Sequence, residues 1–421
     1  MTNSASLADA PRIERDAAVN PVTGRTAGSV QGILLLIGSC LPVLGAVLLA
    51  PILPTLTGVF ASVPGSEALV PLIVTIPALM IALIAPFAGA IVDRVGRKRL
   101  LVVALIVYAV LGTAPLYLDS LPGIVLSRVG VGITEAAIMT CCTTLLADYF
   151  VGARRDKYFG LQTVVTSLAA TAFFVIGGAL GANGWRTPFW LYAVSLLLVV
   201  PVALLIWQPR MQKTGADRAK LPPIPWRALA LPLIVSLFGG LMFYSLIVEL
   251  PYVLAGLGVT EVSTIGAVTA AASLATAIGA ILFRWIARFQ ARRLLPLALG
   301  LGGVGLVIVW FAPSIPVAII GAVITSFGNG ILLPTLLTWA VSGLAFEQRG
   351  RGTGLWTGFL FFGQFACPLV LLALQAPLGS LPAALGALGI ASLVIAVALA
   401  FGLARSTASP DSASAPVPAA H

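Results

Sequence analysis

Long runs of apolar residues are the feature that most limits what this chain can form. Each run extends for about 20 residues without alternating between polar and apolar side chains. A run of this length crosses the hydrocarbon core of a bilayer as a helix, whereas a barrel strand would alternate with a period of two. Backbone N–H and C=O groups must be paired inside hydrocarbon, which a helix achieves within itself. We therefore expect an all-α integral membrane protein.

The composition supports this class. Only 9% of the 421 residues are charged and 59% are hydrophobic, whereas a soluble domain carries roughly 25% charged residues. The apolar runs predict twelve spans, at about 31–58, 69–92, 100–118, 123–147, 158–182, 188–207, 228–257, 264–286, 294–312, 316–345, 353–376 and 382–404.

The basic residues predict the orientation of these spans. If the N-terminus is cytoplasmic, all but two of the 24 lysines and arginines fall in inner segments. The exceptions are Arg186 in an outer loop and Arg128 inside a span. This bias predicts a multi-pass protein of the inner membrane with both termini in the cytoplasm. The net charge of +10 is then a topology signal, and it gives no reason to expect nucleic-acid binding.

A polar stretch divides the chain into two halves of six spans each. Short segments of the first half recur in the second in the same order and at nearly one spacing, as Gly89–Arg94 does in Gly279–Arg284. Parallel repeats of six spans are typical of transporters in which two bundles rock about a central cavity. The predicted regions are a disordered cytoplasmic tail (1–28), a six-helix bundle (29–207), a cytoplasmic linker (208–227), a second six-helix bundle (228–404) and a disordered cytoplasmic tail (405–421).

The stretch GAIVDRVGRKR, residues 89–99, concentrates charge in a chain that otherwise avoids it. We expect it to join spans two and three on the cytoplasmic side, with Gly89 allowing close helix contact and Gly96 allowing a tight turn. Orientation alone requires no acid here, so Asp93 is the unusual member. It can accept a hydrogen bond from Arg97 or face the positive end of another helix. The alternative is an ordinary solvated, positively charged loop.

This stretch resembles the loop signature of the major facilitator superfamily. Leu126–Gly132 is similar to a second motif of that family, whose arginine lies in the membrane. The resemblance covers about 29–404 and implies two six-helix bundles, alternating access and a gate role for Asp93. The second-half counterpart has Phe283 in place of the acid, so an asymmetric gate is expected. The residues on matching positions of the loop signature are Gly89, Asp93, Arg94, Gly96, Arg97 and Lys98.

Further segments resemble one branch of that family. Ala50–Pro54 and Gly363–Pro368 are similar to segments of the twelve-span drug and metabolite efflux proteins. The antiporter motif of the family lies in span five and consists of a run of glycines followed by Gly-Pro. Here Phe174–Gly178 has the paired glycines but lacks the proline, so this motif does not support obligatory antiport.

Three ionisable residues fall inside predicted spans: Arg128, Glu135 and Glu249. Each costs roughly 2.5–3.5 kcal/mol at a helix centre, so each should face the bundle interior or a watery cavity. Arg128 and Glu135 are two helical turns apart, about 10 Å along one face, which suits a shared cavity wall. We expect these three residues to be candidates for proton coupling. The alternatives are a structural charge pair for Arg128 and Glu135, and a position at the outer interface for Glu249.

Uncharged polar residues at membrane depth are the candidates for lining a substrate cavity, although they also serve as helix–helix contacts. They are Gln162, Tyr244, Asn329 and Gln364. The single histidine is His421, no GxxxxGK[ST] motif occurs, and the four cysteines lie in apolar runs. We therefore expect no metal, no cofactor, no direct use of ATP and no enzymatic activity.

Together these features predict a secondary active transporter that works by alternating access. Proton-coupled efflux of a small organic or amphipathic molecule fits best, because the predicted cavity carries few charges. A proton-coupled importer of a small metabolite remains the alternative within this class, and a membrane enzyme or passive channel is disfavoured. The expected partners are the small-molecule substrate and the lipid bilayer, with the protein acting as a monomer.

Overall fold

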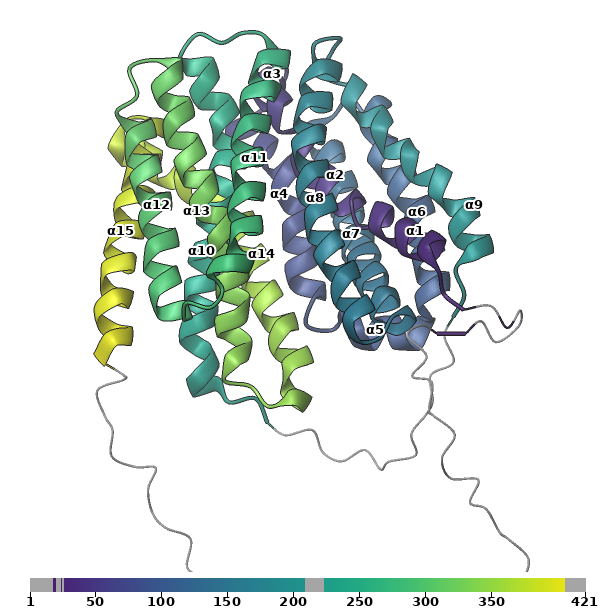
Figure 1. The fold of residues 1–421 in the computed structure, drawn as a ribbon. Coiled ribbons are helices and arrows are strands. Elements are labelled where there is room, and N and C mark those ends of the chain that lie inside the picture. Colours follow the sequence, from purple (N-terminus) through teal and green to yellow (C-terminus); the bar gives the residue numbers. More distant parts are fainter. Residues whose placement is uncertain (1–17, 20–23, 25, 209–222, 406–421) are drawn as a thin grey trace, which may run out of the picture.

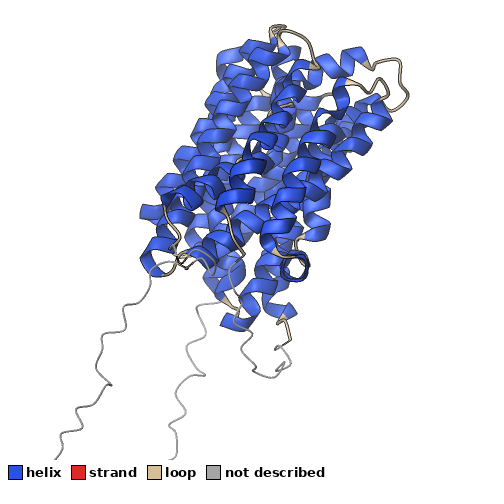
Figure 2. Cartoon of the chain, turned by 90° about the vertical axis from the view of Figure 1, so that its right-hand side faces the viewer, coloured by secondary structure: helices blue, strands red, loops and turns tan. Residues whose placement is uncertain are grey.

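The computed structural model describes residues 18–19, 24, 26–208 and 223–405. Within them, twelve helical segments are long and apolar enough to cross a membrane, which confirms the predicted all-α class. The helices run side by side, with the joints gathered at two ends (Figure 2). These residues form no β-strand, and an isolated bridge pairs Val19 with Thr26.

The helices follow in chain order with short joints. They are α1 (Ser29–Gly38), α2 (Leu41–Val47), η1 (Ala50–Ile52), α3 (Leu53–Val59), α4 (Ser66–Ile84), α5 (Ala88–Val95), α6 (Arg97–Thr113), η2 (Ala114–Leu116), α7 (Leu121–Tyr149), α8 (Gly152–Gly181), η3 (Thr187–Val194), α9 (Ser195–Leu205), α10 (Trp226–Gly256), α11 (Val262–Ile286), α12 (Ala291–Trp310), α13 (Ile315–Ser342), α14 (Phe346–Leu378) and α15 (Leu381–Arg405).

The first span is a broken helix made of α1, α2, η1 and α3. Prolines stand in the first turns of its later pieces: Pro42 in α2, Pro51 in η1 and Pro54 in α3. Proline lacks a backbone N–H and its ring clashes with the preceding turn, so it is accepted at a helix start and interrupts a continuing one. The sequence thus accounts for the breaks as well as for the span.

The second span ends earlier than expected. The prediction ran to residue 92, but α4 ends at Ile84 and a separate short helix, α5, begins at Ala88. Pro86 lies directly after the end of α4, where proline commonly stops a helix. Gly89, Asp93 and Arg94 are therefore helical and lie in α5. The turn itself is at Gly96, whose φ of 90° strongly favours glycine.

The two ends of the helical body differ in charge. One end carries the α5–α6, α7–α8 and α11–α12 joints, and we call it the basic end because most of the described lysines and arginines lie there. The other end carries the α3–α4, α10–α11 and α14–α15 joints, and we call it the opposite end. In Figure 1 the basic end, with α5, is at the bottom and the opposite end, with α3, is at the top.

The helices form two groups that follow the order of the chain. In Figure 1 the first half, purple to teal, lies beside the second half, green to yellow. The main contacts between the halves join α8 to α11 and α4 to α14. We retain 29–207 and 228–404 as the proposed bounds of the two bundles. The predicted tails and linker fall largely outside the described residues, which do not include 1–17, 209–222 and 406–421.

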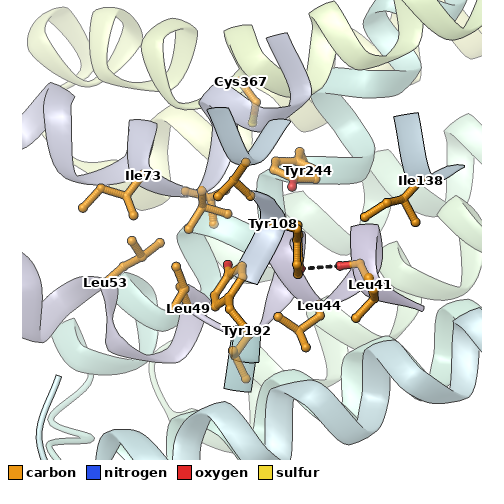
Figure 3. Packing of buried hydrophobic residues seen from close by; sticks show 14 of the residues in the cluster. Leu41, Leu44, Leu49, Leu53, Ile73, Tyr108, Ile138, Tyr192, Tyr244 and Cys367 are labelled. Carbon is orange, nitrogen blue, oxygen red and sulfur yellow. Dashed lines mark hydrogen bonds between the residues drawn. The ribbon is translucent and has the colours of Figure 1, made fainter. Parts of the chain in front are cut away.

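The largest core cluster fills the first half and reaches into the second. Figure 3 shows Leu41, Leu44 and Leu49 around Tyr108, while Tyr244 and Cys367 approach from the second half. The hydroxyl of Tyr108 donates to the carbonyl of Leu41 over 2.7 Å, so this buried polar group is satisfied.

Glycines set the closest approach of the two halves. A Cβ added at Gly178 of α8 would lie 2.9 Å from the Cα of Gly266 in α11, and one added at Gly266 would lie 2.7 Å from the Phe174 carbonyl oxygen. These neighbours are backbone atoms, which cannot rotate away. Small residues at a crossing let helix backbones come close, and dispersion then holds them together.

We therefore expect Gly178→Leu to separate α8 from α11 and to lower the free energy of unfolding by roughly 1–3 kcal/mol, as overpacking of a tight contact does. Gly160→Leu on the same helix is the matched control, because a Cβ at Gly160 meets nothing within 4 Å. Thermal unfolding of the two purified variants measures the difference. Equal unfolding midpoints would contradict the close crossing.

Candidate functional site

A central cavity of about 610 Å³ lies between the two halves of the molecule. Its wall is built by α2, α4, α7 and α8 from the first half and by α10, α11, α13 and α14 from the second. Aromatic residues such as Phe174, Phe243 and Trp356 contribute part of the surface. Aliphatic residues such as Val43 and Ile81 contribute much of the remainder. The uncharged polar residues of the wall are Ser39, Thr143, Gln162, Thr163, Thr166, Ser167, Tyr244, Thr269, Ser273, Thr276, Ser326, Asn329 and Gln364.

All four uncharged residues singled out from the sequence line this cavity. Gln162 donates from Nε2 to Ser39 Oγ (2.8 Å) and, over 3.3 Å, to Thr143 Oγ1. Asn329 donates from Nδ2 to the carbonyl of Met242 (3.1 Å), while its Oδ1 has no partner among the described residues. Tyr244 and Gln364 are buried in the wall on the side of the second half. Gln162 thus joins neighbouring helices, and Asn329 joins α13 to α10.

Hydroxyl residues of the wall were missed by the sequence analysis, although a signal for them exists. On α8 the lining residues are Gln162, Thr163, Thr166, Ser167 and Ala170. Their spacing of three to four residues places them on one helix face. A polar stripe of this kind inside an apolar run marks the face that turns away from lipid.

Glu135 is the one charged side chain among the lining residues, all of which the structure describes. It lies on α7 and is 1% exposed, and its Oε1 has no hydrogen-bond partner among the described residues. A Cβ at Gly45 of α2 would collide with the same carboxylate, so the glycine makes room for it. Gly45 is a site residue that no sequence pattern had marked.

Arg128 lies apart from the cavity, which differs from the expectation that it shares a wall with Glu135. Its Nη2 donates to the carbonyls of Leu111 (2.9 Å) and Gly112 (3.0 Å), where α6 ends. The guanidinium lies 4.9 Å from the ring centroid of Tyr192 and 5.4 Å from that of Phe189, both in η3. Arg128 therefore joins α7 to α6 and η3. Two residues that are two turns apart on one helix face can have different neighbours. Here Arg128 meets neighbouring helices and Glu135 meets the cavity.

Glu249 also lies outside the central cavity. It lines a second cavity of about 290 Å³ at the opposite end, together with Glu67 of α4 and Tyr252 of α10. The structure therefore separates the three intramembrane charges. Glu135 lies at the central cavity, Arg128 within the first half, and Glu249 at the second cavity.

The charged loop signature forms an ion-pair cluster at the basic end. Arg97, at the start of α6, donates to Asp93 Oδ1 in α5 (3.1 Å) and pairs closely with Asp148 of α7. The backbone N–H of Lys98 donates to Gln208 Oε1 over 3.3 Å, and Arg94 is exposed. The expectation that Asp93 accepts from Arg97 agrees with this geometry. Asp148, the one charge at the inner end of the fourth span for which the sequence suggested a secondary gate role, completes the cluster.

Gly89 does not make the close helix contact expected for it. A Cβ at this position would meet nothing within 4 Å, and the residue is exposed. The reason is the early end of α4, which carries Gly89 into the short helix α5 at the rim of the body. The ion pairs of Arg97 with Asp93 and with Asp148 both lie within the first half.

Contacts between the halves close the cavity toward the opposite end. Thr57 of α3 and Tyr252 of α10 share a hydrogen bond of 3.0 Å between their hydroxyls. A Cβ at Gly178 of α8 would lie 2.9 Å from the Cα of Gly266, where α8 crosses α11 of the second half. On the other side the wall extends toward the basic end as far as Thr163, which is exposed.

The chemistry of this cavity is binding, with no arrangement for bond breaking. Among the described residues, no group of three or more His, Cys, Asp or Glu side chains could hold a metal ion. A cavity of this volume admits a drug-sized molecule, since ligand pockets measure about 300–1,000 Å³. Aromatic and hydroxyl groups together suit an amphipathic ligand.

Two relatives of known function resemble this chain over part of its length. The quinolone resistance protein NorA of Staphylococcus aureus is 27% identical over 172 residues, 39% of this chain and 44% of that protein. The class H tetracycline resistance protein of Pasteurella multocida is 26% identical over 195 residues, 45% of this chain and 47% of that protein. The chain therefore spans less than half the length of these relatives.

Solved structures resemble the whole helical body. A bacterial homologue of the human lysosomal transporter Spinster, in an inward-facing and unoccupied conformation, has a TM-score of 0.71 at 18% identity, covering 90% of this chain and 97% of that one. The D-xylose–proton symporter has a TM-score of 0.72 at 15% identity, covering 88% of this chain and 97% of that one. At these identities the likeness establishes the fold alone.

The sequence profile of the Major Facilitator Superfamily matches residues 35–282 and 232–421, which is most of the chain. The profile agrees with the resemblance carried by the loop signature, with the twelve spans and with the fold of the solved structures. The protein is a transporter and not an enzyme. The chain belongs to the Major Facilitator Superfamily.

Proposed function

We propose that this protein exports a small organic, amphipathic molecule across the inner membrane, driven by the proton gradient. The names of the two relatives, quinolone resistance and tetracycline resistance, support export as the direction. The mixed aromatic and hydroxyl lining of the central cavity supports the amphipathic substrate class. Gln162, Tyr244, Asn329 and Gln364 contact the substrate in this proposal, and the protein works as a monomer without a cofactor.

The observation that carries the proposal is the unpaired carboxylate of Glu135 in the cavity wall. A buried charge without a partner is costly, so this side chain is best satisfied when it binds a proton or a cationic partner. If the two bundles rock, the same carboxylate faces first one side of the membrane and then the other. It can then release a proton on one side and gain one on the other, which links the gradient to the motion.

Glu135 carries the proton in this proposal, and the other two intramembrane charges do not. Arg128 is held by two carbonyls and two aromatic rings, so its part is to fix the helices around Glu135. Glu249 does not touch the central cavity. A substrate in that cavity could therefore compete with the proton at Glu135 but not at Glu249.

The gate in this proposal is the cluster of Asp93, Arg97 and Asp148 at the basic end. The excess of lysine and arginine at this end predicts that it faces the cytoplasm, along with both termini. Because α5 is short and stands apart from α4, it can change its contacts without breaking a spanning helix. Regrouping of the ion pairs would then accompany opening and closing of the cavity on the cytoplasmic side.

The test of the function is substrate movement in sealed inverted vesicles with and without an imposed pH gradient. Candidate substrates are first chosen by thermal shift of the purified protein, because a bound ligand stabilises the folded state. We expect a stabilising amphipathic compound to accumulate only when the vesicle interior is acidic. Accumulation that ignores the gradient would exclude proton coupling, and movement in the reverse sense would identify an importer.

Glu135→Gln removes the charge but keeps the shape of the side chain. We expect gradient-driven accumulation to fall at least tenfold while the substrate-induced thermal shift is retained, since the cavity keeps its other polar groups. The matched control is Glu261→Gln, an exposed acid at the start of α11 that hydrogen-bonds Ser263 and Thr264. Unchanged coupling in Glu135→Gln would refute the assignment.

Asp93→Asn weakens the ion pair with Arg97 without removing a hydrogen-bond acceptor. We expect slower transport at normal expression, because the variant alters the balance between the two conformations. Asp119→Asn is the control, since Asp119 also pairs with an arginine, Arg186, but lies at the opposite end. Initial transport rates in the same vesicles compare the variants, and a wild-type rate for Asp93→Asn would rule out the gate role.

A further inference from the structure

The second cavity lies at the opposite end, between the two halves, and the transport cycle proposed above does not use it. Its wall includes Thr57 of α3 and Glu67 of α4 from the first half. The second half contributes Glu249 and Tyr252 of α10 and Gln375 of α14. Figure 1 places α3 at the end of the body away from the basic end. None of these five residues lines the central cavity, so the two spaces have separate walls.

Glu249 is the buried member of this wall. Its side chain is 6% exposed and lines the cavity, and its carboxylate forms no hydrogen bond or ion pair with a described residue. By contrast, Glu67 in the first turn of α4 and Gln375 near the end of α14 are exposed. The cavity therefore has an unpartnered carboxylate in its buried part and a second carboxylate near its entrance.

The charge of the wall determines whether a cation or an anion binds in the second cavity. Glu67 and Glu249 are both acidic, and no lysine, arginine or histidine is among the lining residues, all of which the structure describes. A buried carboxylate without a hydrogen bond is costly, and a cation that enters the cavity relieves this cost. An anion would meet two like charges in a setting of low dielectric constant, where repulsion is strong.

The remaining groups favour an organic cation. The phenol of Tyr252 provides an aromatic face of the kind that attracts ammonium groups. Leu371, Leu372 and Leu381 give the wall an apolar part, which suits carbon-bearing ligands better than a bare metal ion. At about 290 Å³ the cavity is at the small end of ligand pockets, which measure about 300–1,000 Å³.

We propose that this second cavity binds a small organic ammonium ion, about the size of choline, with its charge against Glu249. The site is independent of the substrate cavity and of the export proposed above. Because its walls come from both halves, which the Thr57–Tyr252 hydrogen bond already joins, a bound cation also favours closure of the opposite end.

The experiment measures binding of choline chloride to the purified full-length protein by calorimetry and by thermal shift. Sodium chloride at the same concentration controls for ionic strength. The neutral molecule 3,3-dimethylbutan-1-ol has nearly the same shape as choline but no charge. We expect saturable choline binding with a rise in unfolding temperature, and at least tenfold weaker binding of the neutral molecule.

Variants then locate the site. Glu249→Gln should weaken choline binding at least tenfold, whereas Glu261→Gln, an exposed acid at the same end but outside the cavity, should leave it unchanged. Leu372→Trp fills the cavity but keeps Glu249, and it should abolish choline binding. It tests the site independently if Glu249→Gln fails to fold.

Three results would overturn the proposal. Absence of choline binding to the wild-type protein would mean that Glu249 is satisfied by a proton alone. Equal binding of choline and its neutral analogue would mean that the carboxylates play no part. Loss of choline binding in Glu135→Gln, with normal binding in Leu372→Trp, would move the site to the central cavity. These outcomes leave the export proposal untouched, since its own test uses Glu135 and a pH gradient.

Discussion

Hydrocarbon offers no hydrogen bonds to a polypeptide, and this constraint shapes every part of the molecule. The backbone satisfies itself by forming helices throughout the spans, even where prolines divide the first span into α1, α2, η1 and α3. A buried hydroxyl between helices can bond to the backbone, as Tyr108 does when it donates to the Leu41 carbonyl (Figure 3). Polar side chains are under the same rule, so each one inside the membrane needs a partner or a cavity.

The three intramembrane charges meet this rule in different ways. Arg128 donates from Nη2 to the carbonyls at the end of α6 and lies against two aromatic rings, while its Nη1 has no hydrogen-bond partner among the described residues, and its role is to hold helices together. Glu135 and Glu249 line two separate cavities, and neither carboxylate forms a hydrogen bond or ion pair with a described residue. The cavities separate structure from function here, because an ionisable group that borders an open space inside a membrane protein can bind something from outside.

Contact between the halves follows from the shape of small residues. Gly178 and Gly266 let α8 and α11 touch, while the hydroxyls of Thr57 and Tyr252 join α3 to α10. Between these contacts the two halves leave the central cavity open. A body of two packed units with a hollow between them can change its opening by rotating one unit against the other, without repacking either interior.

The amino-acid order alone determined the class of the protein, its twelve spans and the family to which it belongs. Each depends on local patterns: the length of an apolar run, the position of a proline, the charged loop signature from Gly89 to Arg99. Polarity at membrane depth also identified four residues of the cavity wall, because side chains such as those of Gln162 and Asn329 are unfavourable against lipid.

Only the tertiary structure decided which of the intramembrane charged residues borders which cavity. Arg128 and Glu135 share a helix and differ by two turns, yet one is enclosed by α6 and η3 and the other reaches the cavity beside Gly45. The pairing of Arg97 with Asp148 and the second cavity around Glu249 likewise join residues far apart in the chain. The physical reason is that a sequence fixes the spacing of side chains along one helix, whereas their partners depend on how neighbouring helices are rotated and packed.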